Sequence, residues 1–266
     1  MARSALLNVM VQAAIKAGKS LSRDFGEIQN LQVSVKGPND FASQANQKAE
    51  KIVREELLKA RPTYGFISEE GDDIAGTDGA HRWIVDPLDG TTNFLHGIPQ
   101  FAVSAALERN GEIVAGVIFN PATDELYTAE RGGGAFLNDR RLRVAARKVL
   151  SDAVVGCSLP HLGKGSHGKF LVELRHVMGE VAGVRHLGSA ALDLAYVAAG
   201  RFDGFWETGL SPWDIAAGLI MIREAGGYGT DLSGGHGSLE TGAVVAGNEY
   251  IHKALIEVVQ RPIPTR

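Results

Sequence analysis

Residues 83–93 read Trp-Ile-Val-Asp-Pro-Leu-Asp-Gly-Thr-Thr-Asn, which joins a buried-strand signal to two closely spaced carboxylates. The apolar, β-branched run at the start of this stretch is typical of a buried strand. Pro87 fixes its own φ and disfavours helix at Asp86. We therefore expect the chain to leave the strand in a stiff turn that directs Asp86 and Asp89 toward one point. Gly90 would then let a ligand approach the backbone closely.

Two carboxylates at one point repel each other, by roughly 4 kcal/mol at about 4 Å and an effective dielectric of about 20. A bound cation would relieve that repulsion, and all-oxygen ligands favour hard divalent ions, Mg²⁺ before Ca²⁺. Thr91 and Thr92 add hydroxyl and amide donors at an expected helix start, which suits an anion. The alternative is an acidic surface turn with Pro and Gly, and the preceding apolar strand argues against it.

The composition indicates a compact globular protein rather than a nucleic-acid or membrane protein. The chain has 266 residues, 44% of them hydrophobic, and its net charge is −4. No basic excess points to direct nucleic-acid binding, and no apolar run is long enough for a transmembrane helix. A single cysteine, Cys157, fits a reducing compartment and lies in a strand-like run, where we expect a plain core residue. The N-terminus has no signal-peptide pattern, so we expect a cytoplasmic protein.

The first half predicts helices followed by an antiparallel meander. Apolar spacing predicts a helix over about residues 3–22. Residues 26–39 resemble a strand and loop, and Ser43 is a candidate N-cap for a helix that ends before Pro62. Residues 71–81 form a polar loop and a candidate mobile lid. Further strands are expected at 101–107, 113–119, 125–129, 135–137 and 142–144, with a hairpin at Asn110-Gly111 and a glycine turn at 132–134.

The second half alternates strands and helices, a pattern typical of α/β folds. Strands are expected at 153–159, 184–187, 202–206 and 242–246, and helices at 167–180, 189–199, 212–225 and 248–259. The change in pattern near residue 150 divides two lobes, 1–150 and 151–266, which we interpret as one inseparable catalytic unit. The histidines, including His96, His161, His167 and His186, show no zinc-ligand spacing, so we read them as surface or satisfied residues.

Three stretches together closely resemble the inositol monophosphatase family. They are residues 83–93, then 212–218 (Pro-Trp-Asp-Ile-Ala-Ala-Gly) with the later Glu-Ala-Gly-Gly at 224–227, and the run 188–200. The run 188–200 looks like the bacterial, SuhB-like branch. The resemblance covers essentially the whole chain and implies a layered α-β-α-β-α fold, with an N-terminal antiparallel sheet lobe and a C-terminal α/β lobe. It also implies a homodimer.

The resemblance further implies a Mg²⁺-dependent phosphomonoesterase acting on inositol monophosphates, with two metal ions per subunit. Glu69, Asp86 and the Leu88 carbonyl would hold one ion, and Asp86, Asp89 and Asp214 the other. Without the resemblance, the residue pattern would indicate a helix cap at Asp214. It would not assign any role to Glu69.

The same resemblance implies the substrate contacts. Amides of Gly90, Thr91 and Thr92 would bind the phosphate, beside Asp89 and Asp214. Glu207 and the backbone of Gly188, Ser189 and Ala190 would contact the sugar. A solvated Glu207 and simple capping by Ser189 are the structural alternatives.

One position departs from the family. Asn46 stands where members usually carry an aspartate that is thought to pair with the threonine matching Thr91 and to help activate water. An amide cannot take that proton or carry charge. The catalytic trio Glu69, Thr91 and Asn46 is therefore in doubt at Asn46, as is the occupancy of a weak third cation.

Two other functions stay open. A related enzyme could act on 3′-phosphoadenosine phosphate or histidinol phosphate, although Glu207 and residues 188–190 favour a polyol. SuhB-like proteins are also associated with a regulatory role beside the transcription machinery, and a weakened enzyme kept for protein binding would suit Asn46. A substrate panel and a partner assay separate these alternatives.

Overall fold

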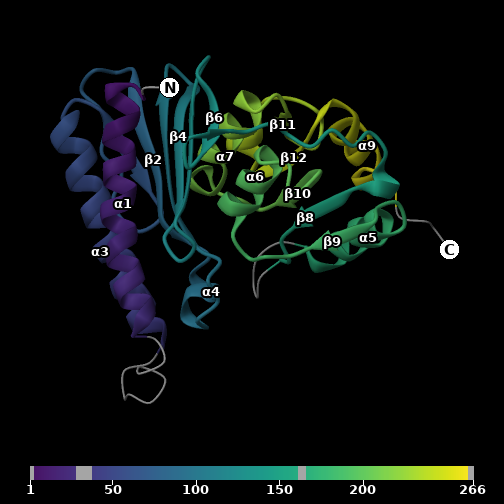
Figure 1. Cartoon of the computed structure of the whole chain (residues 1–266), viewed down its shortest axis with the longest axis horizontal. Coiled ribbons are helices and arrows are strands. Elements are labelled where there is room, and N and C mark those ends of the chain that lie inside the picture. Colours follow the sequence, from purple (N-terminus) through teal and green to yellow (C-terminus); the bar gives the residue numbers. More distant parts are fainter. Residues whose placement is uncertain (1–2, 28–37, 161–165, 263–266) are drawn as a thin grey trace.

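The computed structural model describes residues 3–27, 38–160 and 166–262, which stack in alternating layers of helix and sheet. In Figure 1 the layers run from α1 and α3, through a first sheet, to α6 and α7, then a second sheet, and finally α5 and α9. This is the layered α-β-α-β-α arrangement expected from the sequence. Each helix layer buries an apolar face against a sheet, which is how such elements share one core.

The first sheet has the order β1-β2-β3-β4-β5-β6-β7. Only β1 and β2 pair in parallel, and the remaining pairs are antiparallel, so the predicted meander is confirmed. The Asn110-Gly111 hairpin is also confirmed, because both residues have positive φ. The strands are β1 Gly65–Ser68, β2 His81–Asp89, β3 Ala102–Arg109, β4 Glu112–Asn120, β5 Glu125–Glu130, β6 Gly134–Leu137 and β7 Arg140–Arg141. The strand expected at 142–144 was wrong, because its ladder ends at Arg141.

Helices α1 (Ala5–Gly26) and α3 (Pro38–Ala60) cover the outer face of the first sheet. Their buried faces carry leucine, valine, methionine and alanine at helical spacing, and these pack on inward side chains of β2, β3 and β4. The predicted N-cap at Ser43 was wrong, because α3 begins at Pro38, and proline is favoured in the first turn of a helix. The strand expected within residues 26–39 falls mainly outside the described residues.

A bulge near the end of β2 replaces the predicted turn at Pro87. The β2–β3 ladder passes from Asp86 opposite Ser104 to Asp89 opposite Ala102, so β2 has one extra residue there. Residues three apart on a regular strand point to opposite faces. The extra residue turns Asp89 back to the side of Asp86, a common use of bulges beside functional sites. Pro87 fits this place because it has no N–H to lose from the ladder.

The second sheet has the order β11-β12-β10-β8-β9. Its strands are β8 Val154–Cys157, β9 Gly183–Arg185, β10 Gly204–Thr208, β11 Tyr228–Thr230 and β12 Ala243–Gly247. The helices on its faces are α5 His167–Met178, α6 Ala190–Ala198, α7 Pro212–Glu224 and α9 Glu249–Val259. Helices α6 and α7 lie between the two sheets and fill a core shared by both (Figure 1). That the two lobes form one inseparable unit stays a prediction.

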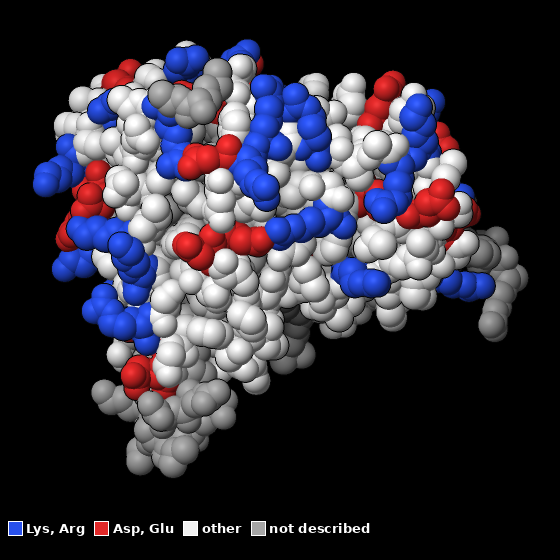
Figure 2. Space-filling model, viewed as in Figure 1, with Lys and Arg blue, Asp and Glu red and all other residues white. Residues whose placement is uncertain are grey.

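The helix start expected at Thr91 and Thr92 is confirmed as α4 (Thr91–Leu95), whereas α8 (Ser238–Thr241) and β11 had no clear sequence signal. None of the helices in the described ranges combines the length and apolarity that crossing a membrane requires. Figure 2 shows basic and acidic side chains interspersed over one face of the molecule. Cys157 is buried and unpaired, as expected of a core residue.

Candidate metal centre

Three aspartates from two distant parts of the chain meet at one point. Asp86 and Asp89 come from β2, and Asp214 comes from the first turn of α7. Each offers a carboxylate oxygen within 4.8 Å of the others. Asp86 and Asp89 are 2% and 9% exposed, and Asp214 is half-buried. Among the described residues, this is the only group of at least three potential metal-ligating side chains that lies so close together.

Glu69 approaches this cluster because of the parallel pairing of β1 and β2. Ser68 is opposite Val85, so the next residues along the two strands, Glu69 and Asp86, emerge side by side. The Glu69 carboxylate raises the pKa of both Asp86 and Asp89, although burial is the largest cause in each case. A parallel register between short strands has no local sequence signature, so the family resemblance, and not the residue pattern, had implied this proximity.

The turn after Asp86 is held by its own polar groups. The Leu88 N–H donates to Asp86 Oδ1 at 2.9 Å, and Thr91 Oγ donates to the Leu88 carbonyl at 3.0 Å. Gly90 has φ +88°, and a Cβ there would lie 2.8 Å from the Gln100 carbonyl oxygen. Only glycine therefore fits between β2 and α4.

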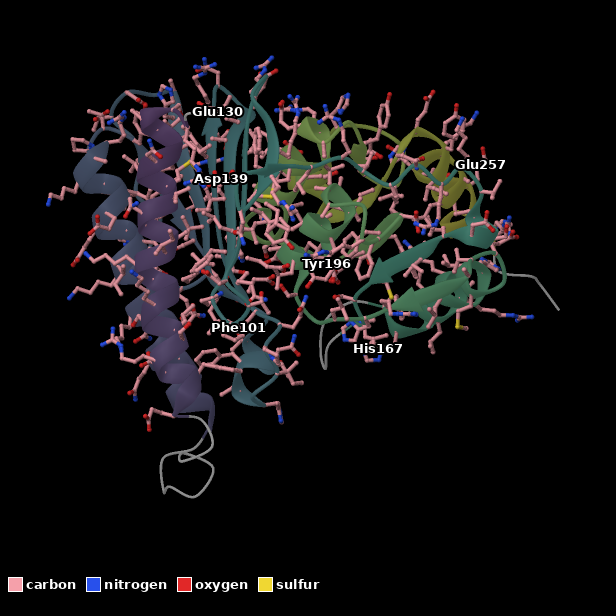
Figure 3. All side chains as sticks on the ribbon, in the orientation of Figure 1. Phe101, Glu130, Asp139, His167, Tyr196 and Glu257 are labelled. Atoms are coloured by element: carbon pink, nitrogen blue, oxygen red, sulfur yellow. The ribbon has the colours of Figure 1, made fainter. Side chains whose placement is uncertain are left out.

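Asn93 ties α4 to the start of α6, a role that the sequence did not reveal. Its Nδ2 donates to the carbonyl oxygens of Gln100, Leu187 and Gly188 at 2.8, 2.7 and 3.3 Å. The Phe94 ring next to it packs edge-on against Phe101, with ring centroids 5.1 Å apart; Phe101 is labelled in Figure 3. These contacts bring residues 188–190 to the edge of the aspartate cluster.

The N-terminus of α6 donates two hydrogen bonds to Asp89. Ser189 Oγ and the Ala191 N–H, at 3.0 Å, both donate to Asp89 Oδ2. Ser189 is also the N-cap of α6 and accepts from the Leu192 N–H, as the capping alternative predicted. The carboxylate of Asp89 is thus held by the start of α6 while it lies in the aspartate cluster.

Asp214 has a similar double role. It is the N3 residue of α7, and its Oδ2 accepts from the Ser211 N–H at 2.7 Å in a capping box. Its capping function is therefore real, and the same carboxylate lies in the aspartate cluster.

The electrostatics of the cluster favour a cation. Burial raises the pKa of Asp89 to about 7, with Asp214 as the next cause. Burial also raises the pKa of Asp86 well above its ordinary value, followed by the effect of Asp89. These groups are costly to ionise together without a positive partner. Closely spaced carboxylate oxygens suit a hard divalent cation better than zinc.

Two further carboxylates, those of Glu207 and Asp193, are close enough to Asp89 for its charge to raise their pKa values. Glu207, on β10, has its pKa raised well above the usual range, first by burial and then by Asp193. Asp193, on α6, is fully buried, and neither of its oxygens has a hydrogen-bond partner within the described residues. Glu207 was predicted as a site residue, whereas Asp193 was missed because a buried aspartate inside an apolar helix has no distinguishing pattern.

Asn46 is 3% exposed and donates from Nδ2 to Glu70 Oε1 at 2.7 Å. Its side chain thus contacts the residue after Glu69. The pairing of Asn46 with Thr91 stays a prediction, since the Thr91 hydroxyl donates to the Leu88 carbonyl. Burial, and then Glu50, raise the pKa of Glu70.

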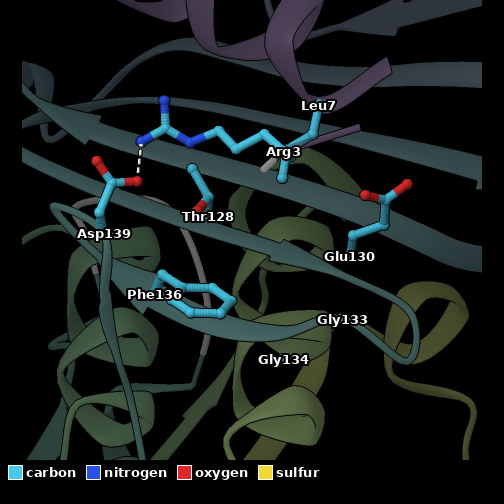
Figure 4. Close-up of a pocket in the computed structure, with 8 residues that line it drawn as sticks. All are labelled: Arg3, Leu7, Thr128, Glu130, Gly133, Gly134, Phe136 and Asp139. Atoms are coloured by element: carbon cyan, nitrogen blue, oxygen red, sulfur yellow. Dashed lines mark hydrogen bonds and ion pairs between the residues drawn. The ribbon is translucent and has the colours of Figure 1, made fainter. Parts of the chain in front are cut away.

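None of the described histidines belongs to the aspartate cluster, and the structure also has a separate pocket. His96 and His167 are exposed, His186 contacts the Cys157 carbonyl oxygen through Nδ1 at 3.2 Å, and His161 lies outside the described residues. Figure 4 shows a cavity of about 60 Å³ beside the Arg3–Asp139 ion pair, whose N···O distance is 2.7 Å. It lies between the start of α1 and the β5–β6 turn, and its lining contains none of the aspartates of the cluster.

Comparison with known proteins agrees with this geometry. Residues 2–263 match the profile of the inositol monophosphatase family. The chain is 77% identical over 266 residues to a Rhizobium meliloti (strain 1021) protein named inositol-1-monophosphatase, with both chains fully covered. It is 43% identical over 263 residues to a Pseudomonas aeruginosa protein named Nus factor SuhB, covering 97% of each chain.

A solved structure is similar over almost the whole fold. The extragenic suppressor protein suhB from Bartonella henselae has a TM-score of 0.91 and 62% sequence identity. The match covers 98% of this chain and 100% of that one. A likeness at this level of identity extends to the layers that position the aspartate cluster.

Proposed function

Because this chain belongs to the inositol monophosphatase family, we propose that it is a Mg²⁺-dependent phosphatase that hydrolyses inositol monophosphates. The observation that carries the proposal is the cluster of Asp86, Asp89 and Asp214, which share one point within 4.8 Å. Carboxylates at this spacing, two of them buried, must either hold a proton or bind a cation, and phosphate monoesters are commonly cleaved at such cation centres.

The ligand assignment is the one that the family resemblance implies, and the closeness of Asp86, Asp89 and Asp214 supports it. Glu69, Asp86 and the Leu88 carbonyl would hold one Mg²⁺, and Asp86, Asp89 and Asp214 would hold a second. When bound, these ions would acidify a water molecule and neutralise charge on the leaving oxygen.

The protein's own groups would orient the reactants. The Thr91 hydroxyl donates its hydrogen bond to the Leu88 carbonyl oxygen. The lone pairs of Thr91 Oγ can therefore accept a hydrogen bond from the attacking water. Glu69 is our candidate for receiving a proton from that water. The amides of Gly90, Thr91 and Thr92 at the start of α4 would donate to the phosphate, because the first N–H groups of a helix have no partner within it.

Attack by water would be in line, without a phosphoenzyme. Cys157 is unsuited as a nucleophile, since burial raises its pKa to about 12. Glu207 and the backbone of Gly188, Ser189 and Ala190 would contact the inositol hydroxyls from the second sheet and α6. A related phosphate ester, such as 3′-phosphoadenosine phosphate or histidinol phosphate, is the alternative substrate.

A panel of phosphate esters tests this proposal. We expect Mg²⁺-dependent phosphate release from inositol 1-phosphate with higher kcat/KM than from 3′-phosphoadenosine phosphate, histidinol phosphate or p-nitrophenyl phosphate. A preference of tenfold or more for one of the other esters would reassign the substrate while keeping the reaction class.

A regulatory function is a second candidate, favoured by the 43% identity to a protein named Nus factor SuhB. It would require a protein partner of the transcription machinery rather than direct nucleic-acid binding, given the net charge of −4. Chromosomal replacement with Asp89→Asn separates the two functions. A cell that keeps the wild-type phenotype with this variant uses a role other than catalysis.

We also propose a homodimer and a cytoplasmic location. Light scattering at micromolar concentration should give twice the chain mass of 28.3 kDa. A mass equal to the single chain would contradict the dimer. Cell fractionation checks the location.

A further inference from the structure

One face of α3 reaches across to the loop that carries Glu69. Asn46, Glu50 and Arg54 recur at four-residue spacing, which places them in one row along the helix. Asn46 Nδ2 donates to Glu70 Oε1 at 2.7 Å. Arg54 Nη2 donates to Glu50 Oε1 at 2.6 Å and to the Asp72 carbonyl oxygen at 3.2 Å. Two members of the row thus bond directly to residues 70–72.

The row on α3 is largely buried, whereas the start of the loop at residues 69 and 70 is exposed. Asn46 and Glu50 are 3% and 6% exposed, but Glu69 and Glu70 are both exposed. The Arg54 guanidinium carbon also lies 4.9 Å above the centre of the Phe66 ring, on β1. A rigid helix therefore offers fixed polar groups to a segment that has little burial of its own.

The loop backbone rests directly on this row. A Cβ at Gly71 would lie 2.2 Å from Glu50 Oε1 and 2.3 Å from Arg54 Nη2, so a side chain at residue 71 would have to displace the ends of these two side chains. Just beyond it, Ile74 turns back and pairs with Phe66, through N–H···O bonds of 2.8 and 2.9 Å. Residues 69–74 thus form a short loop closed by β1 at one end and by α3 along its side.

We propose that Asn46, Glu50 and Arg54 form a clamp that holds residues 70–72 and thereby positions Glu69, with Asn46 acting as a hydrogen-bond donor. Glu69 lies between Ser68, which is fixed by pairing with Val85, and Glu70, which is fixed by Asn46. The proposal rests on the proposed function only in taking Glu69 as a metal ligand.

This role changes how Asn46 is understood. If Asn46 were a weakened substitute for a base, Asn46→Asp would improve the enzyme. In the clamp, the same change removes the Nδ2 donor, because a carboxylate has no N–H. It also sets a new negative charge against Glu70, near the buried Glu50. Asn46→Asp should therefore release the loop rather than activate water.

Hydrogen exchange of the metal-free, full-length protein tests the clamp without any catalytic readout. In Asn46→Asp, amides of residues 69–74 should exchange at least about fivefold faster than in wild type, the effect of losing one partly buried hydrogen bond. Gln47→Glu is the matched control, since it makes the same amide-to-acid change on an exposed neighbour in α3. It should leave exchange in this loop unchanged.

A swapped pair makes the test specific. In Asn46→Asp with Glu70→Gln, the new amide at position 70 can donate to the new carboxylate at position 46. This double variant should return loop exchange to within about twofold of wild type. Glu70→Gln alone keeps an acceptor oxygen for Asn46 and should stay close to wild type.

Magnesium titration links the clamp to Glu69. We expect Asn46→Asp to raise the Mg²⁺ concentration for half-maximal activity at least about fivefold, and the double variant to restore it. Unchanged loop exchange in Asn46→Asp, faster turnover in that variant, or no recovery in the double variant would each overturn the clamp. A wild-type protein without Mg²⁺-dependent activity would overturn the proposed function instead, while the exchange experiment would still decide the clamp.

Discussion

The Ser189 hydroxyl donates a hydrogen bond to Asp89 Oδ2 and so joins residues 100 positions apart in the chain. Together with the Ala191 N–H, it holds the carboxylate of Asp89, which lies in one cluster with Asp86 and Asp214. One hydroxyl therefore caps α6 and orients a proposed metal ligand at the same time.

Ser189→Ala should lower kcat/KM by about tenfold, because one of the two hydrogen bonds that orient Asp89 is lost. It should also destabilise the protein by about 1 kcal/mol, since α6 loses its N-cap. Ser189→Thr keeps a hydroxyl and should recover most of the activity. Steady-state kinetics and thermal melts of both variants measure the two effects. Equal activity losses in Ala and Thr variants would show that the hydroxyl is not what matters.

Asp89→Asn should reduce the rate by roughly 10²-fold or more, because a ligand charge in the proposed centre is removed. It should also abolish most of the rise in melting temperature that Mg²⁺ gives to wild type by linkage. Asp152→Asn, an exposed aspartate on the short helix at Leu150–Asp152, is the control and should behave like wild type. Retention of both the rate and the Mg²⁺ shift by Asp89→Asn would remove Asp89 from the site.

The free energy of unfolding of the metal-free protein should fall as pH rises, whereas a carboxyl group with a lowered pKa gives the opposite dependence. The pKa of Asp89 is raised by burial and by Asp214 to about 7 in the folded state, against an ordinary value of 3.8. Between these values the folded state holds a proton that the unfolded state has lost, so stability falls as pH rises through that window. Asp86 shifts in the same direction.

Thermal melts in EDTA should therefore show Tm falling by at least about 3 °C between pH 5 and pH 7.5, a change of about 1 kcal/mol for a chain of this size. Saturating Mg²⁺ should flatten that fall, because cation binding replaces the bound protons. A metal-free Tm that rises over this pH range would contradict the buried-carboxylate account.

Gly90→Ala should destabilise the protein more than Gly97→Ala. Both glycines have positive φ, but a Cβ at Gly90 meets the Gln100 carbonyl oxygen at 2.8 Å, whereas a Cβ at Gly97 meets nothing within 4 Å. We expect about 1 kcal/mol of loss for Gly97→Ala and at least about 3 kcal/mol for Gly90→Ala. Urea unfolding of the two variants compares them, and equal losses would mean that the turn has room to relax.

Much of the fold could be predicted from local sequence patterns. The Asn110-Gly111 hairpin, the meander strands and the alternating second half follow from turn residues and apolar periodicity, which act over a few neighbours. The start of α3 at Pro38 was missed, because Ser43 offered an equally good local cap. Short elements such as β11 depend on a partner strand and have little signal of their own.

Some residues of the candidate site could also be predicted from local sequence, whereas others could not. The convergence of Asp86 and Asp89 was predicted from their own stretch, but as a stiff turn at Pro87, whereas the structure achieves it with a bulge against β3. Asn93 donates hydrogen bonds to distant segments, and the pKa of Asp193 is raised by burial and then by the distant Asp89; no local pattern identifies either residue. The partner of Asn46 was likewise visible only after folding placed α3 beside residues 69–72.

Phosphate release from inositol 1-phosphate, measured with Mg²⁺ and again with excess EDTA, tests the central claim most directly. The buried aspartates are proposed to work only with a divalent cation, so the account predicts turnover with Mg²⁺ and loss of at least about 10²-fold in EDTA, restored when Mg²⁺ is added back. Full activity in EDTA, or no phosphate release under either condition, would contradict it.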